Sequence, residues 1–366
     1  ERLMLPIVMD SQIATTTPFT NCGTICSFPN FCEDNELFEG MEVWQIDNAF
    51  RQINPQYPAM PTGVGFCMGM NLGAIRKVGL LDAETFGKGY GEENDWCQRA
   101  VKAGFRNVLV DNLFVYHKHG GSFLSEEKAK LLEHNLQELA RRHPNYNRET
   151  ADFCRRDPAG SVRLYVTLQL LNQVLEKKTY VAFDHSLGGG ATEYLDEKVR
   201  EILSDGGCIA TVRYNIYENK YRMIFQYKKY QVECFSEDLN RILCLLPRID
   251  EIWINELVTF QNIYQIQNQI LRLKEQHQAF LKMLLHDFFA ICPAVNLMDE
   301  RGHYCEVAEP ERCNMCIPLN KSNACLDYGT GTEWREKWGY FLENCDEIIA
   351  FSDDSARLLK KAYPGI

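Results

Sequence analysis

The hydrophobic and polar positions follow different patterns in three stretches of the chain. Up to about residue 123, short apolar runs are separated by long loops rich in Thr, Asn, Pro and Phe. This pattern predicts a few strands and helices joined by ordered loops. We place a strand near Ile13, a helix at Trp44–Ile53, a glycine-containing strand at Pro61–Met70, a short helix at Leu72–Val78 and a buried strand at Asn107–Val110.

In the second stretch the apolar positions recur with helical spacing. An amphipathic helix is predicted at Leu124–His143, where Glu, Lys and Leu dominate, and Pro144 ends it. Another helix is predicted at Val162–Lys177. We interpret residues 124–177 as a helical connector.

From Lys178 onward, strands alternate with helices and glycine-containing loops. Predicted strands begin at Thr179, Gly207, Tyr221, Glu251, Phe280 and Glu347, with helices at Asn262–Ala279 and Ser352–Tyr363. This alternation predicts an α/β fold with a doubly wound, Rossmann-like parallel sheet. Ligands bind at the carboxyl ends of the strands in such sheets, which points to Gly188–Gly190, Asn255–Glu256 and His286–Asp287. The expected domains are residues 1–123, residues 178–366 and the connector between them.

Composition narrows the classes of partner. The 366 residues are 45% hydrophobic and 24% charged, which is typical of globular domains with a proper core. A net charge of -11 argues against nucleic acid as a partner. No apolar run approaches the roughly 18 residues of a membrane span. The start of the chain has no signal-peptide pattern, so we expect a cytoplasmic protein, and both ends look cut from something longer.

An acidic cluster follows a glycine-rich loop at Gly87–Arg99. Glu92, Glu93 and Asp95 stand where the pattern turns helical, and carboxylates are favoured at a helix N-terminus. Such a loop presents a base or metal ligands at the edge of a site, or it forms a solvated, acid-capped helix start.

Histidines and cysteines provide candidate metal ligands. His117 and His119 lie on the same side of an extended segment, where they either chelate a metal or form an exposed strand end. The chain has fifteen cysteines, an odd number that favours reduced thiols. One cluster contains a Cys-x-x-Cys pair, which suits a structural zinc or leaves four unlinked thiols. Its members are Cys292, Cys305, Cys313 and Cys316, with His303 and Cys325 as substitutes.

Four stretches in the first part occur in a recognisable order. They are Thr17–Asn21, Pro61–Met68, Phe86–Cys97 and Val115–Phe123. Together they resemble the C-terminal half of a family-2 inverting glycosyltransferase of the GT-A fold, of the kind found in bacterial polysaccharide assembly.

This resemblance implies roles for the acidic loop and the histidines. The family's pair of acidic residues falls on Glu92 and Glu93, and its second member is the general base, which makes Glu93 the expected base. Because this chain has Glu where the family usually has Asp, Asp95 is the rival candidate. The family's metal-ligand histidine matches His117, with His119 as the fallback, and Mn or Mg suits these ligands. Ligand-binding positions expected on the acceptor side are Thr62, Gly63, Gly65 and Trp96.

Three stretches in the last part carry a second resemblance. Phe183–Thr192, His286–Pro293 and Ala350–Leu359 resemble the N-terminal domain of a family-4 glycosyltransferase of the GT-B fold. The resemblance implies that His286 contacts the reacting sugar region. The alternative is that Asp287 holds His286 in place to support a loop. Gly188, Gly189 and Gly190 either let a ligand approach the backbone near a helix N-terminus or form a plain tight turn.

The two resemblances together imply a fused, two-enzyme glycosyltransferase acting on a nucleotide-sugar donor and a glycan or lipid-linked acceptor. The donor-binding halves of both enzymes would lie outside these residues, so we expect no sugar transfer by the 366 residues alone. The alternative is a non-catalytic carbohydrate- or nucleotide-binding module. An NAD-dependent enzyme is disfavoured because the loop at Gly188 lacks the third glycine of Gly-x-Gly-x-x-Gly. Peripheral association with the inner membrane face would come from the acceptor, since no basic amphipathic helix supports it.

Overall fold

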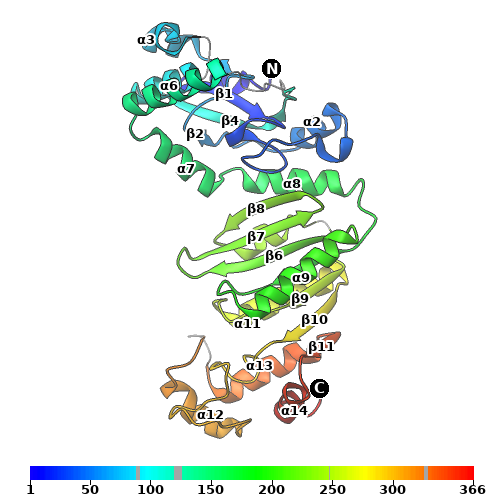
Figure 1. Cartoon of the computed structure of the whole chain (residues 1–366). Coiled ribbons are helices and arrows are strands. Elements are labelled where there is room, and N and C mark those ends of the chain that lie inside the picture. Colours follow the sequence, from blue (N-terminus) through cyan, green and yellow to red (C-terminus); the bar gives the residue numbers. More distant parts are fainter. Residues whose placement is uncertain (88–90, 119–125, 247, 325–328) are drawn as a thin grey trace. The chain divides into compact units, whose positions relative to one another are not determined.

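The computed structural model divides into two compact units, each with its own sheet (Figure 1). Unit 1 is Glu1–Gln173 and unit 2 is Val174–Ile366. The structure describes residues 1–87, 91–118, 126–246, 248–324 and 329–366. Both units combine strands with helices, which confirms the expected α/β class.

Unit 1 is built on a mixed sheet of four strands in the order β2-β4-β1-β3. The strands are β1 (Ile13–Phe19), β2 (Ala59–Met60), β3 (Gly69–Met70) and β4 (Arg106–Phe114). β1 runs parallel to β4, and the short strands β3 and β2 are antiparallel to β1 and β4 respectively. All seven residues of β1 are buried, so this strand lies at the centre of the unit.

The helices of unit 1 surround this sheet. They are α1 (Leu5–Met9), α2 (Val43–Arg51), α3 (Leu72–Val78), α4 (Ala83–Phe86), α5 (Glu92–Lys102), α6 (Glu126–Arg142), α7 (Tyr146–Arg156) and α8 (Gly160–Leu171), with 3-10 turns at Thr24–Cys26 and Phe38–Gly40. α5 buries Trp96, Cys97 and Ala100 against Ala14 of β1 and Ala74 of α3. These positions share one face of the helix because they are one and four residues apart.

Two predictions for unit 1 have different outcomes. The predicted helix at Leu72–Val78 is confirmed with the same bounds. The predicted strand at Pro61–Met70 was wrong for most of its length, because only Gly69–Met70 joins the sheet. In the loop, the backbone N–H groups of Gly63 and Val64 donate to side chains instead of to a neighbouring strand. A strand pattern cannot reveal such side-chain partners.

Unit 2 contains a seven-stranded sheet in the order β11-β10-β9-β5-β6-β7-β8. The strands are β5 (Thr179–Phe183), β6 (Cys208–Asn215), β7 (Lys220–Tyr227), β8 (Tyr230–Ser236), β9 (Glu251–Ile254), β10 (Phe280–Leu285) and β11 (Glu347–Ala350). The strands from β11 to β6 are parallel, and β7 and β8 extend the sheet as an antiparallel hairpin. The sheet is therefore mostly parallel and Rossmann-like, as the alternation of strands and helices predicted.

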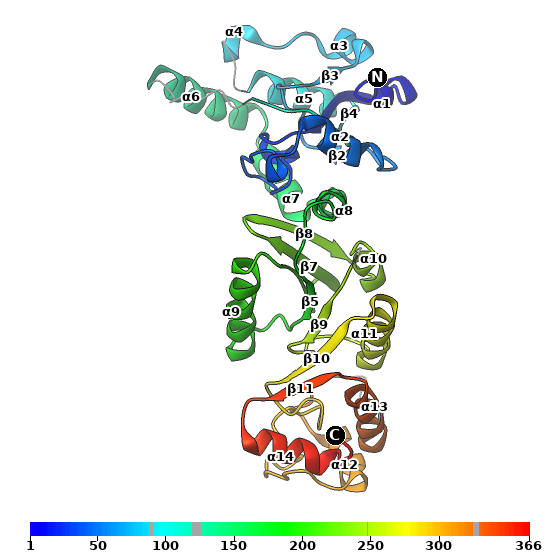
Figure 2. The same cartoon turned by 90° about the vertical axis from the view of Figure 1, so that its right-hand side faces the viewer.

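Helices cover both faces of the unit 2 sheet (Figure 2), with α9 on one face and α10 and α11 on the other. The helices are α9 (Gly190–Ser204), α10 (Leu239–Leu243), α11 (Ile263–His277), α12 (Pro310–Cys316), α13 (Gly331–Glu343) and α14 (Asp353–Ala362), with a 3-10 turn at Ile317–Leu319. Leu195, Val199 and Ile202 of α9 pack against Ala182 of β5 and Trp253 of β9. This apolar layer holds β5, β9 and α9 in a fixed arrangement.

The strand order reverses direction at β5. The chain passes from β5 to β6 on one side, and later enters β9 on the other side of β5. In open α/β sheets, a ligand binds at the carboxyl ends of the strands beside such a switch point. The residues that follow β5, β9 and β10 are therefore the ones that the fold places for binding.

None of the helices in the described ranges has both the length and the apolar composition that crossing a membrane requires.

Candidate functional site

The acidic cluster of unit 1 forms the first turn of α5. Gly91 precedes the helix with φ of +120°, a conformation that favours glycine, and an added Cβ would lie 3.2 Å from the ring of Phe86. Glu92, Glu93 and Asp95 all lie in this turn. The partial positive charge of a helix N-terminus favours carboxylates here.

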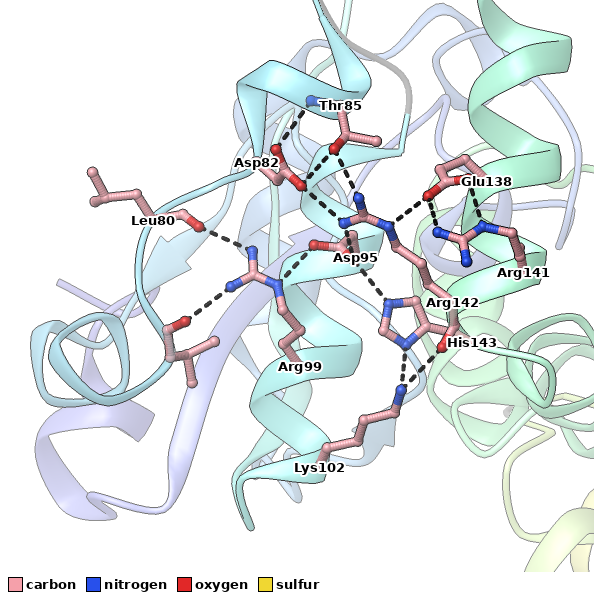
Figure 3. Close-up of polar contacts among 11 residues, drawn as sticks. Leu80, Asp82, Thr85, Asp95, Arg99, Lys102, Glu138, Arg141, Arg142 and His143 are labelled. Carbon is pink, nitrogen blue, oxygen red and sulfur yellow. Dashed lines mark hydrogen bonds and ion pairs between the residues drawn. The ribbon is translucent and has the colours of Figure 1, made fainter.

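The buried carboxylate of Asp95 is surrounded by two arginines and a histidine (Figure 3). Its side chain is 1% exposed, with Arg99 Nε at 2.7 Å and His143 Nε2 at 2.9 Å from its carboxylate oxygens. Arg142 contributes a further contact at 3.7 Å. Lys102 Nζ lies 3.0 Å from His143 Nδ1, and because an ammonium group can only donate, Nδ1 accepts and Nε2 donates its proton to Asp95. Both carboxylate oxygens of Asp95 are therefore engaged by donors within the protein.

Arg142 connects this network to two other helices. Its guanidinium donates to Asp82 and to Thr85 Oγ1, both at 2.8 Å, and to Glu138 at 2.8 Å. Asp82 in turn caps α4 by accepting from the backbone N–H of Thr85. The hydrogen bonds from Arg142 and Thr85 lower the pKa of Asp82 to about 2. The start of α5 is thus tied to α4 and to the end of α6 by charge-assisted hydrogen bonds.

Glu93 lies in a different environment from Asp95. It is partly buried, and its Oε2 accepts a 3.3 Å hydrogen bond from the backbone N–H of Gly91. Burial raises the pKa of Glu93, and the neighbouring charge of Glu92 raises it further. No cation is among the causes of this shift. A carboxyl group with a raised pKa and some access to solvent is suited to accept a proton in a reaction.

Glu92 differs from Glu93 in its hydrogen bonding. Its Oε2 is buried and has no hydrogen-bond partner among the described residues. A buried carboxylate oxygen without a donor is costly, so a donor from a ligand would satisfy it.

The loop that follows β2 lies beside Glu93. A Cβ added at Gly65 would be 3.8 Å from Cδ of Glu93. The next residue, Phe66, stacks its ring on the imidazole of His117 with centroids 5.2 Å apart. The loop thus contacts Glu93 through Gly65 and His117 through Phe66, which places both predicted residues around one loop.

The other predicted ligand-binding residues, Thr62 and Gly63 of this loop and Trp96 of α5, pack within unit 1. Thr62 is 3% exposed and donates to Asn94 Oδ1 at 2.8 Å. A Cβ added at Gly63 would be 2.5 Å from Sδ of Met68, so glycine is needed there for fit. Trp96 is fully buried and donates from Nε1 to the carbonyl oxygen of Gly79 at 2.7 Å. Because its ring is enclosed by the core of unit 1, Trp96 does not reach a ligand.

His117 has one ring nitrogen engaged. Nδ1 lies 3.0 Å from the carbonyl oxygen of Cys22, so Nδ1 carries a proton and donates it to that oxygen. Nε2 makes no hydrogen bond to any described residue. His119 lies outside the described residues. Within the described part of the chain, no three His, Cys, Asp or Glu side chains form a group that could hold a metal. Of the two predicted histidine ligands, the structure describes only His117, and the described residues do not complete a metal site around it.

In unit 2, polar residues meet at the carboxyl ends of three adjacent strands. Asp184 follows β5, Asn255 follows β9 and His286 follows β10. Asn255 Nδ2 lies 2.8 Å from Asp184 Oδ1, and His286 Nε2 lies 2.9 Å from Asn255 Oδ1. The buried Asp184 also pairs with Arg213 of β6, whose Nε is 2.8 Å from Oδ2. The structure therefore brings the predicted His286 and Asn255 to the switch point, together with Asp184 and Arg213, which the sequence did not single out.

A carboxyl pair lies beside this chain of hydrogen bonds. Glu256 and Asp287 are hydrogen-bonded to one another. Burial raises the pKa of Glu256 to about 9, and the charge of Asp287 contributes to this shift. Burial also raises the pKa of Asp287, while the nearby His185 opposes that change. The raised pKa of Glu256 favours its protonated form at neutral pH.

This proton makes the stability of unit 2 depend on pH. An unfolded glutamate has a pKa of about 4.5, whereas the folded value is about 9. The folded state therefore binds the proton more tightly, and its stabilising effect is complete below pH 4.5 and is lost as the pH rises to 9. We expect the free energy of unfolding of unit 2 to fall between pH 6 and 9, by at most ~1.4 kcal/mol per pH unit. Urea denaturation of the protein at several pH values measures this slope.

Glu256→Gln keeps a hydrogen-bond donor but has no proton to lose, so it should flatten this pH dependence. Glu237→Gln, at an exposed glutamate of the same unit, should leave it unchanged. An unchanged slope in the Glu256→Gln variant would show that the proton resides elsewhere.

The glycine loop precedes α9. Gly188 and Gly189 have φ of +78° and +96°, and no atom lies within 4 Å of a Cβ added at Gly188, Gly189 or Gly190. All three glycines are exposed. The left-handed backbone explains the glycines at the first two positions, and the open space leaves the start of α9 accessible.

The four clustered cysteines do not form a metal-binding group in the structure. Cys305 Sγ donates to the carbonyl oxygen of Leu297 at 3.0 Å, and Cys316 Sγ is 3.9 Å from Asn320 Nδ2. Burial raises the pKa of all four thiols, including Cys292 and Cys313. Zinc binds thiolates, so a bound zinc would have to displace these thiol protons. Cys325 lies outside the described residues.

No protein-family model matches the chain, and searches of curated proteins and of solved structures found no match.

Sequence reasoning missed Asp184 and Arg213, and it pointed to Asn255 and Glu256 at a strand end without giving them a role. Asp184 could have been found, because it directly follows a predicted strand whose carboxyl end faces the switch point. Arg213 lies within β6 and carries no local signal. Its role depends on the pairing of β6 with β5.

Proposed function

We propose that the chain is part of a fused glycosyltransferase that moves a sugar from a nucleotide-sugar donor to a glycan or lipid-linked acceptor. Unit 1 would supply the base side of an inverting transferase of the GT-A type. Unit 2 would be the Rossmann-like N-terminal domain of a second transferase of the GT-B type. The observation that carries the proposal is the separation of roles in the first turn of α5, where Asp95 is neutralised by cations and Glu93 is not.

The chemistry needs one carboxylate base. As the acceptor hydroxyl attacks the anomeric carbon, its proton passes to Glu93, a new C–O bond forms and the bond to the nucleotide diphosphate breaks with its electron pair. The attack from the opposite face inverts the configuration. The raised pKa of Glu93 makes it a stronger base than an ordinary glutamate. The resemblance in sequence and the placement of Glu93 and His117 around the loop of Gly65 and Phe66 support this assignment.

The metal and zinc parts of the proposal rest on the sequence. Mn or Mg would neutralise the departing diphosphate, with His117 as one ligand, and the described residues do not complete such a site. A zinc at the cysteine cluster stays a prediction. A position at the inner face of the plasma membrane belongs to the same proposal, through a lipid-linked acceptor.

The test is sugar transfer by the natural polypeptide that contains these residues. Nucleotide diphosphate release is measured with a panel of nucleotide sugars, with and without glycan or lipid-linked acceptors and Mn or Mg. Acceptor-dependent release with inversion at the anomeric carbon is the expected result. Stoichiometric binding of a donor or glycan without turnover would instead favour the non-catalytic carbohydrate- or nucleotide-binding module.

A further inference from the structure

A continuous chain of side-chain contacts leads from Arg213 to the imidazole of His286. Arg213 pairs with Asp184, Asp184 accepts from Asn255, and Asn255 faces His286 Nε2. Asp184 and Asn255 are fully buried. The chain crosses from β6 over the ends of β5 and β9 to the end of β10, so it spans the switch point of the sheet.

The contacts determine which way the Asn255 amide points. One terminal atom lies 2.8 Å from Asp184 Oδ1 and 2.9 Å from the carbonyl oxygen of Ala191. Asp184 is paired with Arg213 and accepts only, and a carbonyl oxygen can also only accept. This atom must therefore be the NH₂ group, and the atom facing His286 must be the amide oxygen.

The amide oxygen in turn determines the tautomer of His286. Because Asn255 Oδ1 can only accept, His286 Nε2 must carry a proton and donate it. Nδ1 makes no hydrogen bond to any described residue. Burial lowers the pKa of His286, the charge of Asp184 favours the imidazolium and His185 opposes it. The neutral ring with a lone pair on Nδ1 fits this environment.

Two aromatic rings hold the plane of the imidazole. Phe351, which follows β11, stacks on His286 with centroids 4.5 Å apart and an angle of 17°. Tyr194 of α9 meets the imidazole edge-on at 5.3 Å. The rings limit the tilt of the imidazole, and Asn255 selects which nitrogen faces the interior.

We propose that Arg213, Asp184 and Asn255 are positioning residues that hold His286 as the Nε2–H tautomer and leave the Nδ1 lone pair for a hydrogen-bond donor of the ligand. A neutral Nδ1 accepts from a hydroxyl or N–H group and offers nothing to a phosphate oxygen. Only the part of this inference that gives His286 a role in sugar transfer rests on the proposed function. The tautomer follows from the contacts alone.

The experiment is NMR spectroscopy of the whole protein labelled with ¹⁵N-histidine. The chain has eight histidines, and the signals of His286 are assigned by their loss in His286→Gln. At pH 7.5 we expect ¹⁵N shifts of a protonated Nε2 and an unprotonated Nδ1, with an Nε2 proton that exchanges slowly enough to be seen. A proton on Nδ1, or an Nε2 proton lost to rapid exchange, would overturn the proposal.

Variants test the role of Asn255. Asn255→Ala should abolish the slowly exchanging Nε2 proton and allow both tautomers, whereas Asn296→Ala, at an exposed asparagine of the same unit, should leave the spectrum of His286 unchanged. An unchanged spectrum in Asn255→Ala would contradict the inference. These readouts do not depend on turnover. If His286 shows the expected tautomer but the protein transfers no sugar, only the proposed function is wrong. If the protein transfers sugar but His286 carries its proton on Nδ1, only the positioning inference is wrong.

Discussion

Glu93→Gln is expected to lower sugar transfer at the first site about 10²- to 10⁴-fold, which is the usual contribution of a general base. Gln has the size of Glu and can still bind an acceptor hydroxyl, but it cannot take its proton. The main effect should therefore fall on kcat, with a small change in KM. The measurement is steady-state kinetics of nucleotide diphosphate release in the natural polypeptide that contains these residues.

Two controls separate catalysis from damage to the fold. Glu84→Gln changes an exposed glutamate on the neighbouring α4 and should leave the rate unchanged. Transfer by the second site should also be unaffected by Glu93→Gln, because unit 2 has its own sheet and core. Undiminished transfer at the first site in Glu93→Gln would exclude Glu93 as the base.

Asp95→Ala is expected to destabilise unit 1 by about 3 kcal/mol, the cost of breaking a buried ion pair by removing one partner. The carboxylate is 1% exposed and is the shared acceptor for Arg99 and His143. Without it, the Nε2 proton of His143 loses its acceptor in a buried position. Urea denaturation, with hydrogen exchange of the α5 amides to assign the effect to unit 1, measures the change.

The matched control is Asp152→Ala. Asp152 pairs with Arg155 on the surface of α7, with side-chain exposures of 41% and 70%. Removing an exposed pair should cost less than about 1 kcal/mol. If Asp95→Ala lowered the free energy of unfolding no more than Asp152→Ala and yet abolished sugar transfer, Asp95 would again be the candidate base.

The local elements were largely predictable from the sequence. The helical spacing of Trp96 and Ala100 predicted α5, and the alternation of strands and helices after Lys178 predicted the mostly parallel sheet of unit 2. These features depend on hydrophobic period and turn residues, which lie within short windows of sequence. Within the predicted helical connector, Pro144 indicates the end of one helix, but the pattern did not resolve α7, which begins at Tyr146.

The site was predictable only in part. The rule that ligands bind at strand ends led to His286 and Asp287. It did not show that Asn255 would contact His286 or that Glu256 would share a proton with Asp287. The contact between Asn255 and His286 joins residues 31 positions apart, and no periodicity connects such positions.

The sequence by itself determined the α/β class, the order of most elements and the position of three carboxylates in one helical turn. The tertiary structure decided what each carboxylate does. Glu93 and Asp95 are two residues apart and chemically similar, but His143, 48 residues beyond Asp95, and Arg99 surround only Asp95. Burial without a cation raises the pKa of Glu93. Charge compensation depends on which distant residues the fold brings together, and therefore only the three-dimensional contacts distinguish the two carboxylates as candidate bases.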